Sequence, residues 1–209
     1  MFQFPKSSTK TTWSSQAELW GEKGLMPYLG NEALGLCFGM ASIWVKDNAP
    51  YEVKKLVQSK KDKITKVQIA LMENSSTGMA MMWWTATQCI HLAFVKPDNR
   101  NYVFKKNVDE LLLEVVGGKK AEHHVISFYF RDKNDEEGAH AIGVSLSDTT
   151  GSIFDPNYGI GVYESRLLLG SDLEKLIHTY GSPTKANVIT IPNDDDFGDF
   201  QYGKDEQNF

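Results

Sequence analysis

The hydrophobic pattern of this chain of 209 residues changes its period near residue 120. Before that point apolar residues recur every three or four positions, which is typical of amphipathic helices. After it apolar and polar residues alternate, which is typical of strands with one buried face. The helices come first, and the strands that follow are connected by short turns. This order predicts an α+β fold with an antiparallel sheet. A chain of this length can bury a sizeable core, and we expect one domain over residues 1–209.

The ends of the expected elements are marked by caps, glycines and turn residues. Helices are expected at residues 15–24, 36–47, 51–61, 64–75, 78–95, 107–116 and 170–181. Asn107 is a suitable N-cap, and Gly170 and Gly181 bracket the last helix. Strands are expected at residues 123–132, 139–148, 151–157, 161–165 and 186–192. The polar residues 1–14 and about 193–209 are expected to be loose tails.

The charge and the cysteine content limit the partners and the compartment. The formal net charge is −5, and the lysines of residues 53–66 alternate with apolar residues, as on the solvated faces of helices. This pattern argues against nucleic acid as the main partner. Two cysteines provide no disulfide framework, so we expect the folded chain to work in a reducing compartment.

No segment has the sequence of a membrane span or of a cleavable signal peptide. The N-terminal residues lack the apolar core of such a peptide. The most apolar segment, residues 78–95, is interrupted by Thr, Gln and His, so we expect a buried helix there. A secretion route that needs no such signal peptide stays open.

An imidazole and a carboxylate stand on neighbouring expected strands. His140 lies among small residues in "GAHAIGV", and Asp155 follows in "FDPNYG". A carboxylate beside an imidazole fixes the tautomer and the orientation of the ring, as in nucleophilic triads. Packing alone also explains a strand histidine, and Asp-Pro-Asn is by itself a turn signal.

Cys37 is the best candidate for a nucleophile that would complete this pair. It lies in "GLCFGMASIW", in the first turn of an expected helix, where unpaired N–H groups and the helix dipole favour a thiolate. Gly35 and Gly39 leave the sulfur uncrowded. A buried cysteine that acts only as a small apolar residue is the structural alternative. The order of the three residues, first on a helix and then on two strands, favours the Cys-His-Asp arrangement.

These three segments resemble the signature blocks of the YopT/AvrPphB-type cysteine proteases, which are papain-like effectors that bacteria inject into host cells. In that family a Cys opens a helix that carries a Trp, here Trp44. A His follows in a strand, and an Asp follows in a DPN-aromatic-G block about fifteen residues later. The same interval here is 155 − 140 = 15 residues. The matching blocks span residues 35–159.

The resemblance implies a papain-like α+β fold, with the Cys on a helix and the His and Asp on the sheet. It implies Cys37 as nucleophile, His140 as general base and acid, and Asp155 as the residue that orients His140. It also implies an amide before the nucleophile in the oxyanion hole. Asn31 is the candidate, and it equally suits a turn or an N-cap. Trp44 is interpreted as a core residue behind the helix.

The implied function is a cysteine endopeptidase that cleaves a specific, host-cell protein through a thioester. The implied route is a specialised bacterial secretion system into the host cytosol, with no cofactor. Acyl transfer to an amine, as in transglutaminases and deamidases, is an alternative on the same residues. A module that only binds a host protein is another.

Other clusters of reactive residues are weaker candidates. Cys89 and His91 are two positions apart, so on a helix they point to different faces. The pair His123 and His124, with the acidic residues 132–137, could suggest a metal site. Adjacent strand residues face opposite sides, however, and no second ligand pair has a zinc spacing, so no metal is expected. The chain has no phosphate-binding glycine motif.

Overall fold

A computed structural model describes residues 4, 10–12, 36–75, 102–105, 107–118 and 122–192 of the chain. The helices expected at 15–24 and 78–95 lie outside the described residues, as does the C-terminal tail.

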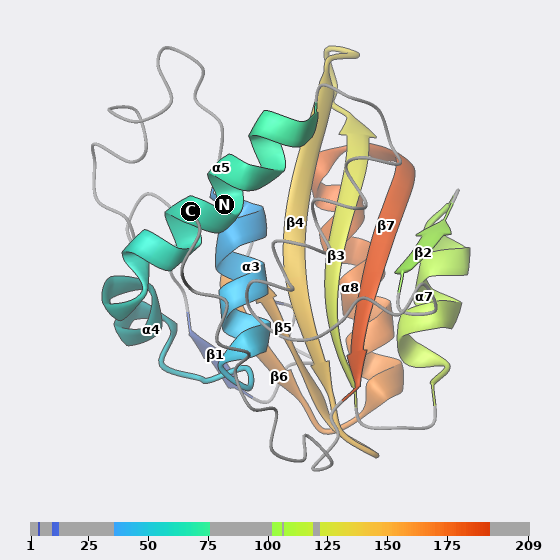
Figure 1. The fold of residues 1–209 in the computed structure, drawn as a ribbon. Coiled ribbons are helices and arrows are strands. Elements are labelled where there is room, and N and C mark those ends of the chain that lie inside the picture. The colour runs from blue at the N-terminus through green and yellow to red at the C-terminus, as the bar shows by residue number, and fades with distance from the viewer. Residues whose placement is uncertain are drawn as a thin grey trace.

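Seven strands form one sheet in the order β1-β6-β5-β4-β3-β7-β2, and every neighbouring pair is antiparallel (Figure 1). The strands are β1 (Lys10–Thr12), β2 (Tyr102–Lys105), β3 (Glu122–Arg131), β4 (Glu137–Leu146), β5 (Gly151–Asp155), β6 (Gly159–Tyr163) and β7 (Ser182–Pro192). The neighbouring strands β4, β3 and β7 are the longest. The expected antiparallel α+β arrangement is therefore confirmed.

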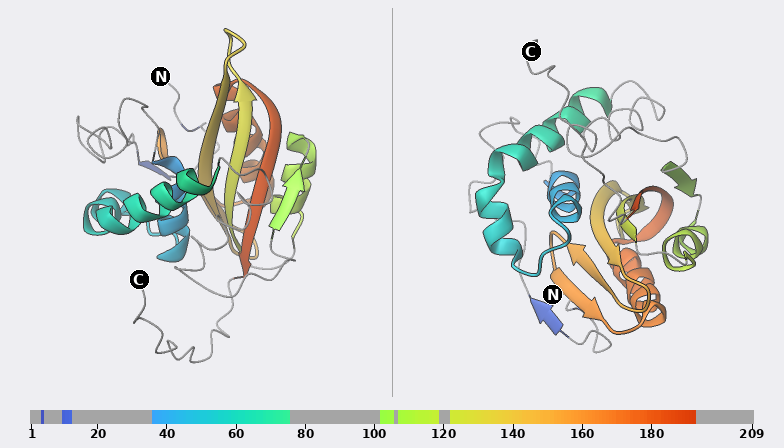
Figure 2. Two further views of the ribbon diagram at one scale, coloured as in Figure 1. Left: turned by 45° about the horizontal axis from the view of Figure 1, so that its top comes forward. Right: turned by 60° about the horizontal axis from the view of Figure 1, so that its bottom comes forward.

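Helices cover both faces of this sheet (Figure 2). They are α3 (Cys37–Lys46), α4 (Val53–Ser59) and α5 (Lys61–Ser75) on one face, and α7 (Val108–Val116) and α8 (Arg166–Tyr180) on the other. Successive strand residues point to opposite faces, so neighbours such as Val125 and Ile126 belong to two different cores. Among the described residues, no helix has the length and hydrophobicity that a membrane span requires.

Helix α3 is held tightly between the sheet and α5. Trp44 is fully buried, packs on Phe154 with ring centroids 5.4 Å apart, and donates from Nε1 to the carbonyl oxygen of Pro50. A Cβ atom at Gly143 would lie 2.5 Å from the indole, so this position on β4 admits only glycine at the observed spacing. The interpretation of Trp44 as a core residue is confirmed.

Gly39 lets α5 approach the first turn of α3. A Cβ atom there would lie 2.4 Å from the carbonyl oxygen of Ile64. The Gly39 N–H, which has no acceptor within its own helix, donates to Oε1 of Gln68 on α5. Gly39, two residues after Cys37, therefore serves the packing of α3 against α5.

Two helix ends show where the sequence signals were sufficient and where they were not. The Asn107 cap is confirmed, because its side chain accepts a hydrogen bond from the Glu110 N–H. Helix α8 begins at Arg166, so the start expected at Gly170 was wrong. The Ser165 side chain caps this helix by accepting from the Leu167 N–H. Gly170 lies inside the helix, where a Cβ atom would be 3.1 Å from Val116 of α7.

The two edge strands were not expected from the sequence. Residues 10–12, inside the segment expected to be a loose arm, form β1 and pair with β6. Residues 102–105 form β2 and pair with β7. Both strands are short, and pairing with a distant partner decides their conformation.

Burial of His124 predicts that the stability of the fold falls in acid. The side chain is fully buried, and Nδ1 lies 3.0 Å from Oγ1 of Thr190. Burial, followed by the charges of His123 and Arg166, lowers the pKa of His124 to about 3. The Glu122 carboxylate, 3.8 Å from Nε2, is too far for a hydrogen bond and does not offset the burial.

We therefore expect the wild type to lose stability as pH falls below about 6.5, because the unfolded chain then binds a proton that folded His124 does not. By pH 4.5 this contribution is on the order of 2 kcal/mol, or about 4–8 °C in Tm. His124→Asn should reduce the fall in Tm between pH 7 and pH 4.5, measured by circular dichroism. The matched control is His178→Asn, at an exposed position of α8. An unchanged pH dependence in His124→Asn would contradict the prediction.

Candidate active site

The candidate residues lie where the sheet divides. Strand β4 pairs with β5 only from Gly143↔Phe154 to Leu146↔Gly151. On the N-terminal side of Gly143, β4 pairs with β3 and no longer with β5. In this part of β4, His140 pairs with Phe128 of β3. Asp155 is the last residue of β5. The two strands therefore separate at the level of His140 and Asp155, which leaves room for their side chains between them.

The imidazole of His140 and the carboxylate of Asp155 are in contact. Nε2 of His140 lies 3.2 Å from Oδ1 of Asp155. His140 is 5% exposed and Asp155 is 0% exposed. Because the carboxylate occupies the Nε2 side of the ring, Nδ1 is the nitrogen that remains for a second partner.

Cys37 also contacts the imidazole, from the N-terminal end of α3. It is the first residue of the helix, is partly exposed, and forms a hydrogen bond with His140. The N-terminal end of a helix carries a partial positive charge, which favours a thiolate. The structure thus brings together Cys37, His140 and Asp155, which are 103 and 15 residues apart along the chain.

The charges of this cluster keep the imidazole protonated. Burial opposes the positive charge, but the Asp155 carboxylate, its hydrogen bond and the contact with Cys37 outweigh burial and raise the pKa of His140 to about 10. At neutral pH the ring is therefore an imidazolium between a carboxylate and a sulfur. This arrangement is suited to holding a thiolate ready for attack and to donating a proton afterwards.

Asp155 performs a turn function and contacts the ring at the same time. Its Oδ1 accepts a hydrogen bond of 2.7 Å from the Asn157 N–H, and its carbonyl oxygen accepts one of 3.1 Å from the Tyr158 N–H. The turn fixes the direction of the carboxylate that faces His140. The two sequence interpretations of Asp155 are therefore compatible with each other.

Tyr180 belongs to this cluster, and sequence reasoning missed it. Its hydroxyl oxygen lies 2.9 Å from Nε2 of His140, and its ring stacks on the imidazole with centroids 4.3 Å apart. It is the last residue of α8, 40 residues from His140. A tyrosine at the end of an amphipathic helix carries no local signal of such a contact.

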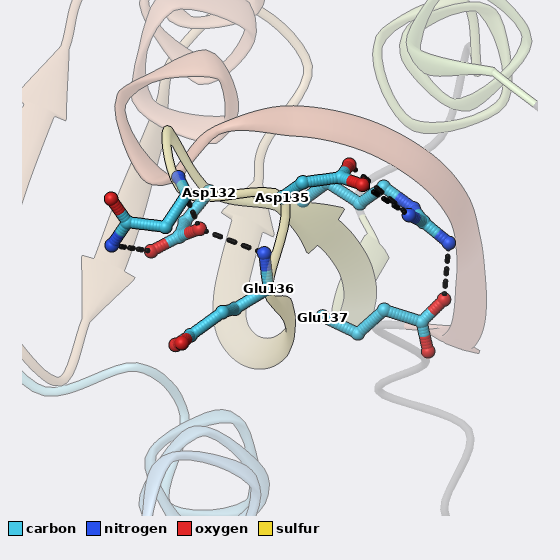
Figure 3. A network of polar contacts seen from close by, with 6 residues as sticks. Asp132, Asp135, Glu136 and Glu137 are labelled. Carbon is cyan, nitrogen blue, oxygen red and sulfur yellow. Dashed lines mark hydrogen bonds and ion pairs between the residues drawn. The ribbon is translucent and has the colours of Figure 1, made fainter.

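The residues considered for a metal site do not form one among the described residues. No group of three or more His, Cys, Asp or Glu side chains there could hold an ion. In the acidic loop between β3 and β4 the carboxylates of Asp132, Asp135 and Glu137 have other partners (Figure 3). Arg131 pairs with Asp135 and Glu137, at 3.1 and 2.9 Å. Asp132 accepts from the N–H groups of Asn134 and Glu136, at 2.8 and 2.9 Å.

Three other candidates lie outside the described residues. They are Asn31, the proposed oxyanion amide, and the pair Cys89 and His91. Their places relative to the cluster therefore stay predictions.

The chain matches a known family along most of its length. The family model described as Yersinia/Haemophilus virulence surface antigen, peptidase C58, matches residues 1–191. A YopT-like protein of Bradyrhizobium diazoefficiens is 31% identical over 97 residues, which are 45% of this chain and 34% of that protein. The match thus spans about a third of the length of this curated relative.

A solved structure of low sequence identity has a similar fold. AvrPphB, an avirulence protein of Pseudomonas, superposes with a TM-score of 0.57 at 18% identity, over 75% of this chain and 90% of that one. PatoxP, a cysteine protease-like domain of the Photorhabdus asymbiotica toxin PaTox, has a TM-score of 0.49 at 12% identity, over 90% of this chain and 55% of that one. The likeness to AvrPphB confirms the expected papain-like α+β fold.

Proposed function

Because the chain belongs to the peptidase C58 family of YopT-like, papain-like cysteine proteases, we propose that it is an endopeptidase that uses Cys37, His140 and Asp155 as its catalytic triad. The observation that carries this proposal is the buried His140 ring, which contacts both the Asp155 carboxylate and Cys37. The family has a protein as substrate, and we propose that the substrate here is a specific protein of a host cell.

The chemistry follows from the charges of the three residues. The Cys37 thiolate attacks the carbonyl carbon of the scissile peptide bond, and a carbon–sulfur bond forms while the carbonyl oxygen becomes negative. The His140 imidazolium gives its proton to the leaving amine nitrogen as the carbon–nitrogen bond breaks. Neutral His140 then removes a proton from water, and the resulting hydroxide hydrolyses the thioester to a carboxylic acid and regenerates the thiolate.

The developing negative oxygen needs hydrogen-bond donors near Cys37. The first N–H groups of a helix have no acceptor within it, and the Cys37 N–H is one of them. The neighbouring Gly39 N–H is already taken by Gln68. We propose that the Asn31 side chain supplies the second donor, as the family resemblance implies.

The host-cell substrate and the delivery route are also proposed, and both rest on the family resemblance. We propose that a specialised bacterial secretion system delivers the chain into the host cytosol. Acyl transfer to an amine would use the same thioester, with an amine or water attacking a glutamine-derived acyl group. A pure binding module would keep the residues without turnover.

The test is a comparison of the products in an extract of eukaryotic cells. The full chain and its Cys37→Ala variant are incubated with the extract, and new protein N-termini are enriched and identified by mass spectrometry. N-termini that appear only with the wild type support the protease. Glutamine deamidation or crosslinks without new N-termini would favour acyl transfer, and identical extracts would contradict both enzymatic functions.

Substitutions of Asp155 separate its function in the turn from its effect on the His140 ring. In Asp155→Asn the side-chain oxygen can still accept the Asn157 N–H, but the negative charge beside His140 is lost. We expect kcat to fall at least about ten-fold, or about 1.4 kcal/mol of barrier, with little change in Tm. Asp155→Ala should be worse, because it also frees the ring to rotate.

Measurements of kcat and Tm on the two Asp155 variants decide between the two functions. Unchanged kcat in Asp155→Asn, together with a lower Tm in Asp155→Ala, would mean that Asp155 serves the turn alone.

A further inference from the structure

We propose that Tyr180 is a positioning residue of this site, whose hydroxyl links the ring of His140 to the carboxylate of Asp155 and whose ring fixes the plane of the imidazole. This inference rests on the proposed function for its catalytic consequence. The contacts themselves come from α8, on the face of the sheet opposite to α3. The imidazole is therefore held from both layers of helices.

The hydroxyl of Tyr180 lies among four polar atoms. It is 2.9 Å from Nε2 of His140, 3.0 and 2.9 Å from the two carboxylate oxygens of Asp155, and 3.1 Å from Nδ2 of Asn157. The distance from Nε2 to the hydroxyl is shorter than the 3.2 Å from Nε2 to the carboxylate. The tyrosine is thus at least as close a partner of the ring nitrogen as Asp155 is.

The donors and acceptors around this oxygen determine the direction of its hydrogen bonds. A phenol has one proton to donate and two lone pairs that accept. The carboxylate can only accept, so the Tyr180 proton goes to Asp155. The amide of Asn157 donates to the oxygen. The single N–H proton at Nε2 of His140 is shared between this oxygen, at 2.9 Å, and Oδ1 of Asp155, at 3.2 Å. Every hydrogen-bonding capacity of the hydroxyl is then satisfied.

The hydroxyl keeps its proton under all working conditions. Burial, and then the charge of the Asp155 carboxylate, raises the pKa of Tyr180 far above its ordinary value. The phenol therefore remains a donor to Asp155 wherever the protein is folded. The hydroxyl therefore helps to fix the orientation of the imidazole relative to the carboxylate, and it does not itself become charged.

The ring of Tyr180 adds a second constraint. It lies at 25° to the imidazole with centroids 4.3 Å apart, and Phe128 contacts the imidazole edge to face at 5.7 Å. A stacked aromatic ring stabilises a cation and excludes water from the His140–Asp155 contact. Phe128 therefore adds a second aromatic contact to the imidazole.

The end of α8 holds Tyr180 in place. Gly181 follows immediately with φ of +149°, and a Cβ atom there would lie 2.2 Å from the carbonyl oxygen of Arg131. Only glycine permits this close approach, and the chain turns directly into β7. Tyr180 is therefore fixed between a helix end and the central strands.

The test uses the full chain labelled with ¹⁵N-histidine and observes the ring N–H of His140 by NMR. The signal is assigned by its absence in His140→Ala. Tyr180→Phe keeps the stacked ring and removes the hydroxyl with its contacts to His140, Asp155 and Asn157. Because the ring N–H loses one acceptor, we expect its exchange with water to be about ten-fold faster. We also expect alkylation of Cys37 by iodoacetamide at pH 6 to be several-fold slower, measured on the peptide that contains Cys37.

Two further variants make the result specific. Tyr163→Phe makes the same change at another buried tyrosine, on β6, and should leave both readouts unchanged. Asn157→Ala keeps the tyrosine but removes one donor to its oxygen, so it should change both readouts in the same direction and by less. If Tyr180→Phe does not fold, Asn157→Ala tests the inference in its place.

Wild-type ring exchange and alkylation in both Tyr180→Phe and Asn157→Ala would overturn the inference. A different result would contradict the proposed function, namely that the wild type produces no new N-terminus in the extract. Neither NMR nor alkylation requires the substrate, so the two failures are distinguishable.

Discussion

Replacing Cys37 with serine should abolish cleavage as completely as replacing it with alanine, a fall of at least about 10⁴-fold. A serine hydroxyl attacks only if a base removes its proton. His140 is already protonated at neutral pH, because Asp155 holds the pKa of the ring high even against burial. The imidazolium therefore cannot activate a serine, although it can accompany a thiolate.

Both Cys37 variants should keep the fold. Cys37 is partly exposed at the first position of α3, and the helix is fixed by Trp44 and by the contact of Gly39 with α5. The measurement is the rate of cleavage of the first substrate identified by its new N-terminus, together with Tm. Substantial cleavage by Cys37→Ser would contradict a preformed thiolate–imidazolium pair. Host effects that persist in Cys37→Ser would favour the binding module.

Replacing His140 with alanine should lower kcat by about 10²–10⁴-fold, because the proton donor to the leaving amine is lost. The small neighbours Ala139 and Ala141 suit the strand, so we expect the fold to remain. His178→Ala, at an exposed position of α8, is the control and should retain activity. A His140→Ala variant that keeps more than about a tenth of the wild-type activity would exclude the proposed role.

The same variant should also change how stability depends on pH. The pKa of His140 is raised from its ordinary value near 6.5 to about 10, so the folded chain binds a proton that the unfolded chain has lost in this window. This contribution to stability is complete below about pH 6.5 and disappears as pH rises through about 10. His140→Ala should therefore lose less Tm than the wild type between pH 7 and pH 10. Parallel Tm curves of the two proteins would contradict the raised pKa.

Much of the fold was contained in local sequence patterns. The change of period near residue 120 predicted helices before an antiparallel sheet, and the central strands follow the alternating runs closely. The Asn107 cap is a local hydrogen bond within one turn, which is why it could be predicted. Edge strands β1 and β2 and the start of α8 at Arg166 were not predicted, because distant pairing and the Ser165 cap decided them.

Part of the candidate site could likewise be predicted from the sequence, and part was decided by the tertiary structure. Sequence alone singled out the candidate residues: a cysteine that opens a helix, a histidine in a strand and an aspartate at the end of the next one. Their contact depends on the register that ends β4–β5 pairing at Gly143↔Phe154 and on the packing of α3 against the sheet. Tyr180 and the buried, charged state of His140 were decided by tertiary structure alone. Hydrophobic period and capping act within a few residues, whereas burial and charge act between side chains that only the folded chain brings together.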